Sequence, residues 1–329
     1  MTESAPAAVE VAGLRKEYGA LVAVDGVDLT VRTGETFGFL GPNGAGKSTT
    51  IKILCTLVAP TSGTARVAGH DVVAERAEVR RHIGLVFQDT TLDAYLSAEL
   101  NLRFHAELYG IPKDALEPRL RQVLEMVGLW ERRGEKVQNF SGGMKRRLEI
   151  ARGLMHSPRV LFLDEPTVGL DPQTRASIWG YINELREQEN ITIFLTTHYM
   201  DEAENCDRIA IMDAGRIVAL DTPEALKASV GVDRVRISTA DDEAAIAALA
   251  EQFGIEASVR DGLVTFGVAD GERFVPRLFD TLGVPIRSVE TTRPSLDDVF
   301  LTYTGRTIRD AEATAGDRNR ASPFIQGRR

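Results

Sequence analysis

Cysteines and long apolar runs are both scarce in this sequence. Of its 329 residues only two are cysteines, Cys55 and Cys206, and their spacing suits neither a metal site nor a disulfide framework. The longest apolar runs, such as residues 209–212, are far shorter than the ~18 residues that a membrane-spanning helix needs. The N-terminus has no positively charged segment followed by an apolar one, so we expect no secretory signal. These absences favour a cytosolic chain without a membrane span of its own.

Positively charged residues are also fewer than negatively charged ones. The sequence has 39 lysines and arginines against 48 aspartates and glutamates, a net charge of −9. Such a balance argues against a protein that coats nucleic acid or binds anionic lipid over its whole surface. A hydrophobic share of 43% and a charged share of 26% are those of a folded globular protein. The length suffices for one large α/β domain and a smaller one.

The most informative stretch is a glycine-rich loop between an apolar run and a helical run. Residues 37–40 favour a buried strand, and residues 48–54 have helical periodicity. The loop between them fits the pattern G-x-x-x-x-G-K-[ST], whose glycines let backbone N–H groups converge on phosphate oxygens. Its lysine adds a full positive charge to the phosphates, and its serine hydroxyl is a hard ligand suited to Mg²⁺. We therefore expect a nucleoside triphosphate site formed by Gly41, Pro42, Asn43, Gly44, Ala45, Gly46, Lys47, Ser48 and Thr49.

Two adjacent carboxylates follow a second apolar run, residues 160–163. Asp164 can hold Mg²⁺, and Glu165 can orient and polarise an attacking water. The alternative is a solvated turn, but the apolar residues before the pair place it at the end of a buried parallel strand.

Three further residues carry little or no signal when each is taken alone, and Gln88 carries none. His198 ends another apolar run and can donate toward a γ-phosphate, although a histidine there is more often an ordinary polar residue. Gln88 follows residues 83–87, and its amide can reach Mg²⁺ or the water. Tyr18 suits a base-stacking platform as well as it suits a core position.

A second glycine-containing helix start precedes residues 144–156. Ser141, Gly142 and Gly143 give this start the geometry that binds anions at a helix N-terminus. An ordinary N-cap explains Ser141 equally well. The sequence therefore raises the question of what the second helix start binds.

Strands alternate with helices along most of the chain, which predicts a doubly wound, mostly parallel sheet with ligands beyond the carboxyl ends of its strands. After residue 222 the pattern changes to a βαββαβ order typical of a small ferredoxin-like domain, and residues 295–303 favour a capped helix. From residue 306 the chain is polar and arginine-rich, so we expect a disordered tail. The predicted parts are an N-terminal tail (1–8), a large domain (9–225) with a helical subdomain (about 90–157), a small domain (230–305) and the tail (306–329).

Taken together, these motifs resemble the nucleotide-binding subunit of an ATP-binding cassette (ABC) transporter over about residues 9–220. The signature of that family is matched by residues 140–144, with Phe140 in place of the usual leucine. The resemblance implies a P-loop NTPase cassette and assigns these roles: adenine stacking to Tyr18, the Walker A loop to residues 41–48, the Q-loop to Gln88, the Walker B strand and catalytic glutamate to residues 160–165, the D-loop to Asp171 and the switch to His198.

The resemblance also implies partners. In this family two cassettes dimerise head to tail and trap two ATP molecules, so Ser141 and Gly143 would contact the γ-phosphate held by the other protomer. Hydrolysis at Glu165 would release the dimer, and the segment 89–96, with Leu92, Tyr95 and Leu96, would pass the movement to an integral membrane permease. An ordinary amphipathic loop is the alternative for that segment.

The single cassette, the small C-terminal domain and residues 293–301 resemble the daunorubicin-resistance type of exporter ATPase. That resemblance implies a peripheral subunit on the cytoplasmic face of a bacterial membrane, working with separate membrane proteins to expel hydrophobic compounds. An import ATPase with a regulatory C-terminal domain stays open. A translation factor with two cassettes fits less well, and the span between Lys47 and Ser141 is too short for the coiled coil of a DNA-repair cassette. The sequence does not identify the transported compound.

Overall fold

A computed structural model of the chain describes residues 7–260 and 262–305. The predicted disordered tail (306–329) and residues 1–6 of the predicted N-terminal tail lie outside the described residues. The described chain divides into two compact units, one ending at Asp221 and the other beginning at Thr222. No helix in the described ranges is long and apolar enough to cross a membrane.

The first unit is built on a six-stranded sheet with the order β10-β9-β3-β8-β7-β6. All neighbouring strands run parallel except β9 and β10, which form an antiparallel hairpin. The central strands are apolar on both faces because helices cover them, and the rings of Phe37, Phe39 and Phe194 pack with centroids 5.1–5.8 Å apart. The strands are β3 (Thr36–Leu40), β6 (Ile83–Val86), β7 (Val160–Asp164), β8 (Thr192–Thr197), β9 (Arg208–Asp213) and β10 (Arg216–Asp221).

A second, antiparallel sheet in this unit has the order β2-β1-β4-β5. Its strands are β1 (Ala7–Tyr18), β2 (Leu21–Arg32), β4 (Ser62–Val67) and β5 (His70–Asp71). Alternation of apolar and polar residues predicts short strands at 9–14 and 27–31. In the structure β1 and β2 are longer and form one hairpin that includes Tyr18. The polar ends of β1 and β2 do not alternate apolar and polar residues. Pairing of the two strands with each other, and not burial of side chains, therefore extends them beyond the predicted lengths.

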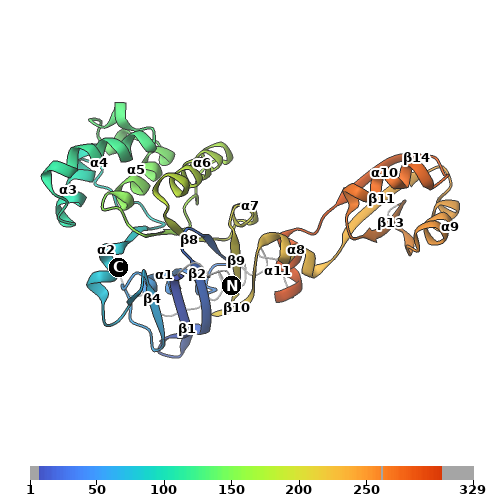
Figure 1. The fold of residues 1–329 in the computed structure, drawn as a ribbon, viewed down its shortest axis with the longest axis horizontal. Helices are drawn as coiled ribbons and strands as arrows, with labels where there is room; N and C mark the ends of the chain where they lie inside the picture. Colours follow the sequence, from blue (N-terminus) through green and yellow to red (C-terminus); the bar gives the residue numbers. More distant parts are fainter. Residues whose placement is uncertain (1–6, 261, 306–329) are drawn as a thin grey trace, which may run out of the picture. The chain divides into compact units, whose positions relative to one another are not determined.

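Helices surround the six-stranded sheet, and Figure 1 shows α3, α4 and α5 grouped together. The sequence pattern predicts a helix over 178–186. Helix α6 begins earlier, at Pro172, because Asp171 caps it and proline suits the first helical turn. The sequence also missed α2 and α7. The helices are α1 (Lys47–Leu54), α2 (Arg76–His82), α3 (Ala98–Leu108), α4 (Lys113–Met126), α5 (Gly142–Leu154), α6 (Pro172–Glu189) and α7 (Met200–Ala203), with the 3₁₀ turns Trp130–Arg132 and Val137–Asn139.

The second unit has an antiparallel sheet with the order β12-β13-β11-β14. Its chain order, β11–α9–β12–β13–α10–β14, is that of a ferredoxin-like fold. A helix missed from the sequence, α8, packs against α11, where Ser229 Oγ lies 3.4 Å from the Tyr303 hydroxyl. The elements are α8 (Pro223–Val230), β11 (Asp233–Thr239), α9 (Asp242–Phe253), β12 (Ala257–Arg260), β13 (Leu263–Val268), α10 (Gly271–Thr281), β14 (Ile286–Thr292) and α11 (Leu296–Thr304). The predicted fold class, an α/β cassette with a small α+β domain, is confirmed.

Candidate functional site

The glycine-rich loop joins β3 to α1, at the carboxyl end of the six-stranded sheet. Gly46 has φ 109° at the start of α1, a conformation that side chains rarely adopt. A Cβ on Gly46 would lie 2.4 Å from the carbonyl oxygen of Ala23, and one on Gly41 would lie 2.3 Å from that of Met212. Close approach of neighbouring strands therefore requires these glycines, in addition to the phosphate geometry argued from the sequence.

Lys47 is the first residue of α1, and its side chain is 4% exposed. Its ammonium donates to the carbonyl oxygens of Gly41 at 2.6 Å and Pro42 at 3.2 Å. The same Nζ lies 3.5 Å from Glu165 Oε1. A buried charge needs partners of this kind, and the loop thereby holds a cation where phosphate oxygens would enter.

Asp164, the last residue of β7, meets two hydroxyl groups. Its Oδ1 accepts from Ser48 Oγ at 3.0 Å and from Thr196 Oγ1 at 2.6 Å. The oxygen atoms of Ser48 and Asp164 are hard ligands of the type that Mg²⁺ prefers. The donor set therefore fits the metal expected from the sequence, and Thr196, which the sequence did not single out, orients the carboxylate.

Glu165 sits in a left-handed backbone conformation, with φ 47°. Its amide donates to Thr196 Oγ1 at 3.0 Å, which helps to hold this unusual turn. Its carboxylate lies 3.4 Å from His198 Nδ1, a long contact, and 3.5 Å from Lys47 Nζ. Burial raises the pKa of Glu165, but the adjacent His198 and Lys47 outweigh burial and bring the pKa below its usual range. The carboxylate is therefore ionised at neutral pH.

Gln88 has no recorded contact with Lys47, Glu165 or His198 among the residues that the structure describes. Gln88 follows β6 and its side chain is exposed. The residue before it is held instead: the carbonyl of Phe87 accepts from Arg146 of α5. The predicted roles of Gln88 at the metal and the water stay predictions.

Arg146 is a central residue that sequence reasoning missed. Its guanidinium is buried and donates to the carbonyl oxygens of Pro166 at 2.5 Å and of Asp164 and Glu165 at 3.2 Å each. Burial lowers the pKa of Arg146 from its usual range, against the opposing charge of Glu149. The side chain thus fixes the turn that carries both carboxylates, and an arginine in the buried stripe of a predicted helix was the available signal.

The same helix also holds the chain after Gln88. Glu149 Oε1 accepts from the amide of Thr91 at 2.8 Å, and Arg152 donates to the carbonyl and hydroxyl oxygens of Thr91 at 3.0 and 2.5 Å. Helix α5 therefore connects the Glu165 turn to the segment beyond β6.

The second glycine-containing helix start is more open. Ser141 is exposed and caps α5 by accepting from the amide of Met144 at 3.3 Å. A Cβ on Gly143 would lie 2.5 Å from Thr174 Cγ2, so packing against α6 requires this glycine. A hollow beside it is lined by Ser141, Gly143, Arg147 and Thr174 among others.

Asp171 and Tyr18 occupy surface positions. Asp171 caps α6 by accepting from the amide of Thr174 at 3.0 Å, and hydrogen bonds from Thr174 lower its pKa. Tyr18 is 47% exposed, with Lys16 Nζ 4.9 Å from its ring centroid. The nucleotide roles of Gly142, Asp171 and Tyr18 stay predictions.

Comparison with known protein families gives two matches that together cover most of the chain. A family model described as ABC transporter matches residues 24–168. A second model, described as the C-terminal domain of DrrA1-3-like ATP-binding proteins, matches residues 222–304.

Comparison with characterised sequences gives relatives of nearly the same length. The chain is 40% identical to the daunorubicin resistance ATP-binding protein DrrA3 of Streptomyces coeruleorubidus, over 94% of this chain and 99% of that protein. It is 39% identical to the linearmycin resistance ATP-binding protein LnrL of Bacillus subtilis, over 90% of this chain and 98% of that protein.

Solved structures of similar fold also come from this class of protein. The chain resembles cbiO1 of Clostridium perfringens, part of the ABC transporter complex cbiONQ, with a TM-score of 0.63 and 30% identity over 67% of this chain and 90% of that one. It also resembles a dimeric ATP-binding cassette in a post-hydrolysis state with ADP and Pi, with a TM-score of 0.59 and 27% identity over 65% of this chain and 98% of that one.

Proposed function

Because this chain belongs to the ABC transporter family of ATP-binding proteins, in the group that carries a DrrA-like C-terminal domain, we propose that it hydrolyses ATP to energise an exporter of hydrophobic compounds. The relatives named for daunorubicin and linearmycin resistance support this direction of transport. The observation that carries the proposal is the buried group of Lys47, Glu165 and His198 at the carboxyl end of the sheet.

The glycine loop and Lys47 bind the phosphates of ATP, with Lys47 exchanging its loop carbonyl partners for phosphate oxygens. Ser48 and Asp164 would hold Mg²⁺, since their oxygens already meet at 3.0 Å. Bound there, Mg²⁺ supplies positive charge that offsets the charge of the phosphate oxygens. Arg146 keeps the Asp164–Glu165 turn in place while this exchange occurs.

Glu165 orients the attacking water by accepting a hydrogen bond from it, and the carboxylate takes up the proton that the water loses as its oxygen attacks the γ-phosphorus. The bond from phosphorus to the β–γ bridging oxygen breaks, and ADP and inorganic phosphate form. A low pKa keeps Glu165 ionised for this task, and His198 beside it fixes the direction of the carboxylate.

Two copies of the chain form the complete site. The open start of α5 has an exposed serine cap and backbone N–H groups but no carboxylate in its first turn. It therefore suits the γ-phosphate held by the loop of a second protomer, in a head-to-tail dimer. The 27% identical cassette that is dimeric with ADP and Pi supports this arrangement.

The permease docks on α3 and the segment before it. Of the three residues expected to grip it, only Tyr95 is largely exposed, at 77%, whereas Leu92 and Leu96 are partly buried. Helix α3 adds an exposed apolar stripe at i, i+4 and i+8, formed by Leu100, Phe104 and Leu108. Because Arg152 and Glu149 bind Thr91 just before this surface, α5 transmits movement between the nucleotide and the permease. The protein thereby works peripherally on the cytoplasmic face of the membrane.

The test is co-purification of Glu165→Gln protein from detergent-solubilised membranes of its source bacterium in the presence of ATP and Mg²⁺. We expect a multi-span membrane protein in stoichiometric amount, because the variant accumulates the ATP-bound dimer. Recovery of ribosomes or DNA-bound proteins, with no membrane protein, contradicts the transport proposal and leaves the ATPase chemistry intact.

A matched pair of variants locates the docking surface. Phe104→Arg places a charge in the α3 stripe and abolishes co-purification. Phe279→Arg changes a phenylalanine of similar exposure in the second unit, 54% against 62% for Phe104, and leaves co-purification unchanged. Equal loss in both variants, or in neither, refutes docking on α3.

A further inference from the structure

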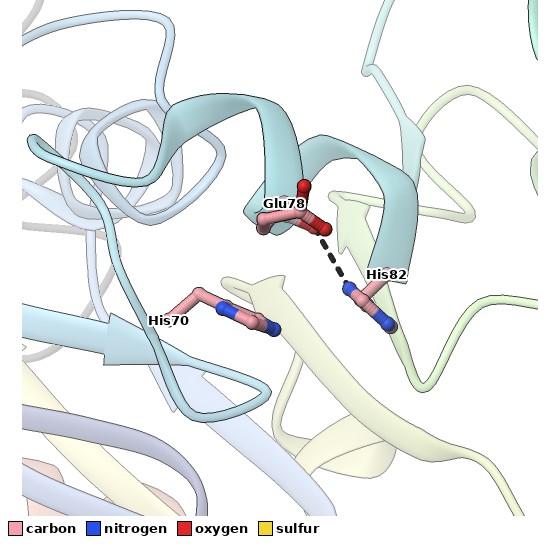
Figure 2. A group of neighbouring side chains, drawn as sticks. All are labelled: His70, Glu78 and His82. Atoms are coloured by element: carbon pink, nitrogen blue, oxygen red, sulfur yellow. Dashed lines mark hydrogen bonds between the residues drawn. The ribbon is translucent and has the colours of Figure 1, made fainter.

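Three side chains outside the nucleotide site form a compact group on β5 and α2. Glu78 and His82 lie four residues apart on α2 and so share one face of the helix, and His70 belongs to β5 beside it. One ring nitrogen of each histidine and one carboxylate oxygen of Glu78 all lie within 4.8 Å of one another, and Figure 2 shows the three side chains gathered together. The two imidazole rings stack, with centroids 5.1 Å apart.

Both histidines have one nitrogen held by a neighbour. His82 Nδ1 lies 2.8 Å from the main-chain carbonyl of Glu78, and a carbonyl only accepts, so Nδ1 carries the hydrogen. His70 Nδ1 lies 3.1 Å from Glu75 Oε1, a carboxylate that also accepts. In both rings the lone pair is therefore on Nε2, and metal-binding histidines have this arrangement of a held N–H and a free second nitrogen.

The loop that sets the distance between β5 and α2 is fixed by its own hydrogen bonds. Asp71 Oδ1 accepts from the amides of Val73 and Ala74 at 2.8 Å each, and Glu75 Oε2 accepts from the amide of Asp71 at 2.9 Å. On α2, Val79 is fully buried and anchors the helix. The groups are thus brought together before any ligand binds, which reduces the entropy lost on binding.

We propose that His70, Glu78 and His82 bind one Zn²⁺ ion, or another divalent transition-metal ion that prefers imidazole and carboxylate ligands. Water would complete the coordination. Imidazole nitrogens and a carboxylate suit such an ion, whereas Mg²⁺ prefers oxygen ligands alone. The donors move together by small torsions of partly exposed side chains, since Glu78 is 40% and His70 27% exposed. Arg81 Nη1 pairs with Glu78 Oε1 at 2.5 Å, which leaves the second carboxylate oxygen for the ion.

A bound ion would join the four-stranded sheet to α2. That helix continues directly into β6, whose far end carries Phe87 and Gln88. The ion would therefore restrict movement of α2 and β6, which lead to the segment around Thr91 that α5 also holds.

The test uses the full chain, purified with a tag free of histidine, stripped with a chelator and kept without nucleotide. Titration calorimetry with Zn²⁺ alone is expected to give one equivalent bound, and Co²⁺ is expected to give the visible absorption of a site with nitrogen ligands. Saturation raises the melting temperature of the first unit by about 5–10 °C at a hundredfold excess over Kd.

The variants form a graded series. His70→Asn and His82→Asn each weaken Zn²⁺ binding at least about 100-fold. Glu75→Gln, at a residue that holds His70 and the amide of Asp71 but is not itself a proposed ligand, weakens it by about tenfold or more. Glu125→Gln is the control, because it makes the same chemical change as Glu75→Gln at a helix carboxylate outside the group, where the partner is Arg121 at 2.7 Å. ATP turnover in Mg²⁺ without zinc stays at the parent level in all four variants.

Two outcomes overturn the site. One is failure of the parent protein to bind a stoichiometric ion. The other is binding that persists unchanged in His82→Asn, with melting in chelator confirming that the variant is folded.

Discussion

The two glycine-containing helix starts of the first unit differ in what surrounds them. At the start of α1, Lys47 is buried, and its ammonium lies 3.5 Å from the carboxylate of Glu165. His198 lies 3.4 Å from the same carboxylate. At the start of α5, Ser141 is exposed and its hydroxyl caps its own helix. Similar local sequences therefore produce a site with acid–base groups in one place and an open helix end without acidic residues in the other. Glycine at a helix N-terminus is thus not enough for the chemistry, which also requires buried charged partners.

The largest expected effect tests the chemical side of this comparison. Glu165→Gln removes the ionised carboxylate and keeps its shape, so turnover falls by about 10³-fold while ATP affinity changes by less than about threefold. Steady-state hydrolysis and equilibrium nucleotide binding measure the two quantities. Parent-level turnover would remove Glu165 from the reaction.

Lys47→Ala tests the binding side. Loss of a charge-assisted contact to phosphate weakens ATP binding by about 100-fold. Lys52→Ala is the control, because Lys52 is an exposed lysine in the last turn of the same helix. Full ATP affinity in Lys47→Ala, or an equal loss of affinity in both variants, would refute the proposal that Lys47 binds the phosphates.

Acid affects the helices around α5 through a buried histidine. Burial, together with the charges of Arg152 and His156, lowers the pKa of His105 to about 4. Between that pKa and the unfolded value of about 6.5 the unfolded chain binds a proton that the folded chain does not, so stability falls as pH falls. From pH 7 to pH 5 this residue removes about 2 kcal/mol of unfolding free energy.

Denaturant titration of the parent and of His105→Gln measures this contribution. The variant is expected to lose less stability over the same pH interval. All five histidines of the chain lie in the first unit, so the transition of the second unit serves as an internal control. Identical pH slopes in the two proteins would refute the assignment.

The smallest effect tests the open helix start. Ser141→Ala and Ser97→Ala each remove a serine N-cap, from α5 and α3 respectively, and each costs about 1 kcal/mol of stability. In a Glu165→Gln background, only Ser141→Ala is expected to weaken ATP-dependent dimerisation, by about tenfold. Light scattering across a concentration series measures it. Equal weakening by both variants would make Ser141 a cap and nothing more.

Strands and helices were predicted correctly where the pattern of apolar residues within one segment shows that segment's structure. The apolar runs of β3, β7 and β8 are continuous because these strands are covered on both faces. The sequence pattern predicts these strands at 37–40, 160–163 and 191–195, within one or two residues of their bounds in the structure. Helix α2 was missed because Val79 is its sole buried residue, which leaves no apolar periodicity. Helix α8 was also missed, although Thr222 and Pro223 provide the N-cap and first-turn signals that could have found it.

The phosphate-loop motif, the two carboxylates that follow β7 and the fold class could be predicted from the sequence, because each depends on neighbours in the chain. The folded structure was needed to show that Arg146 holds the Glu165 turn, that Glu149 binds Thr91, and that His70 stacks on His82. Those contacts join segments that the strand order brings together, and neither helical nor strand periodicity encodes which distant segments become neighbours. Burial then adjusts their chemistry, since a charge removed from water depends on the partners that the fold provides.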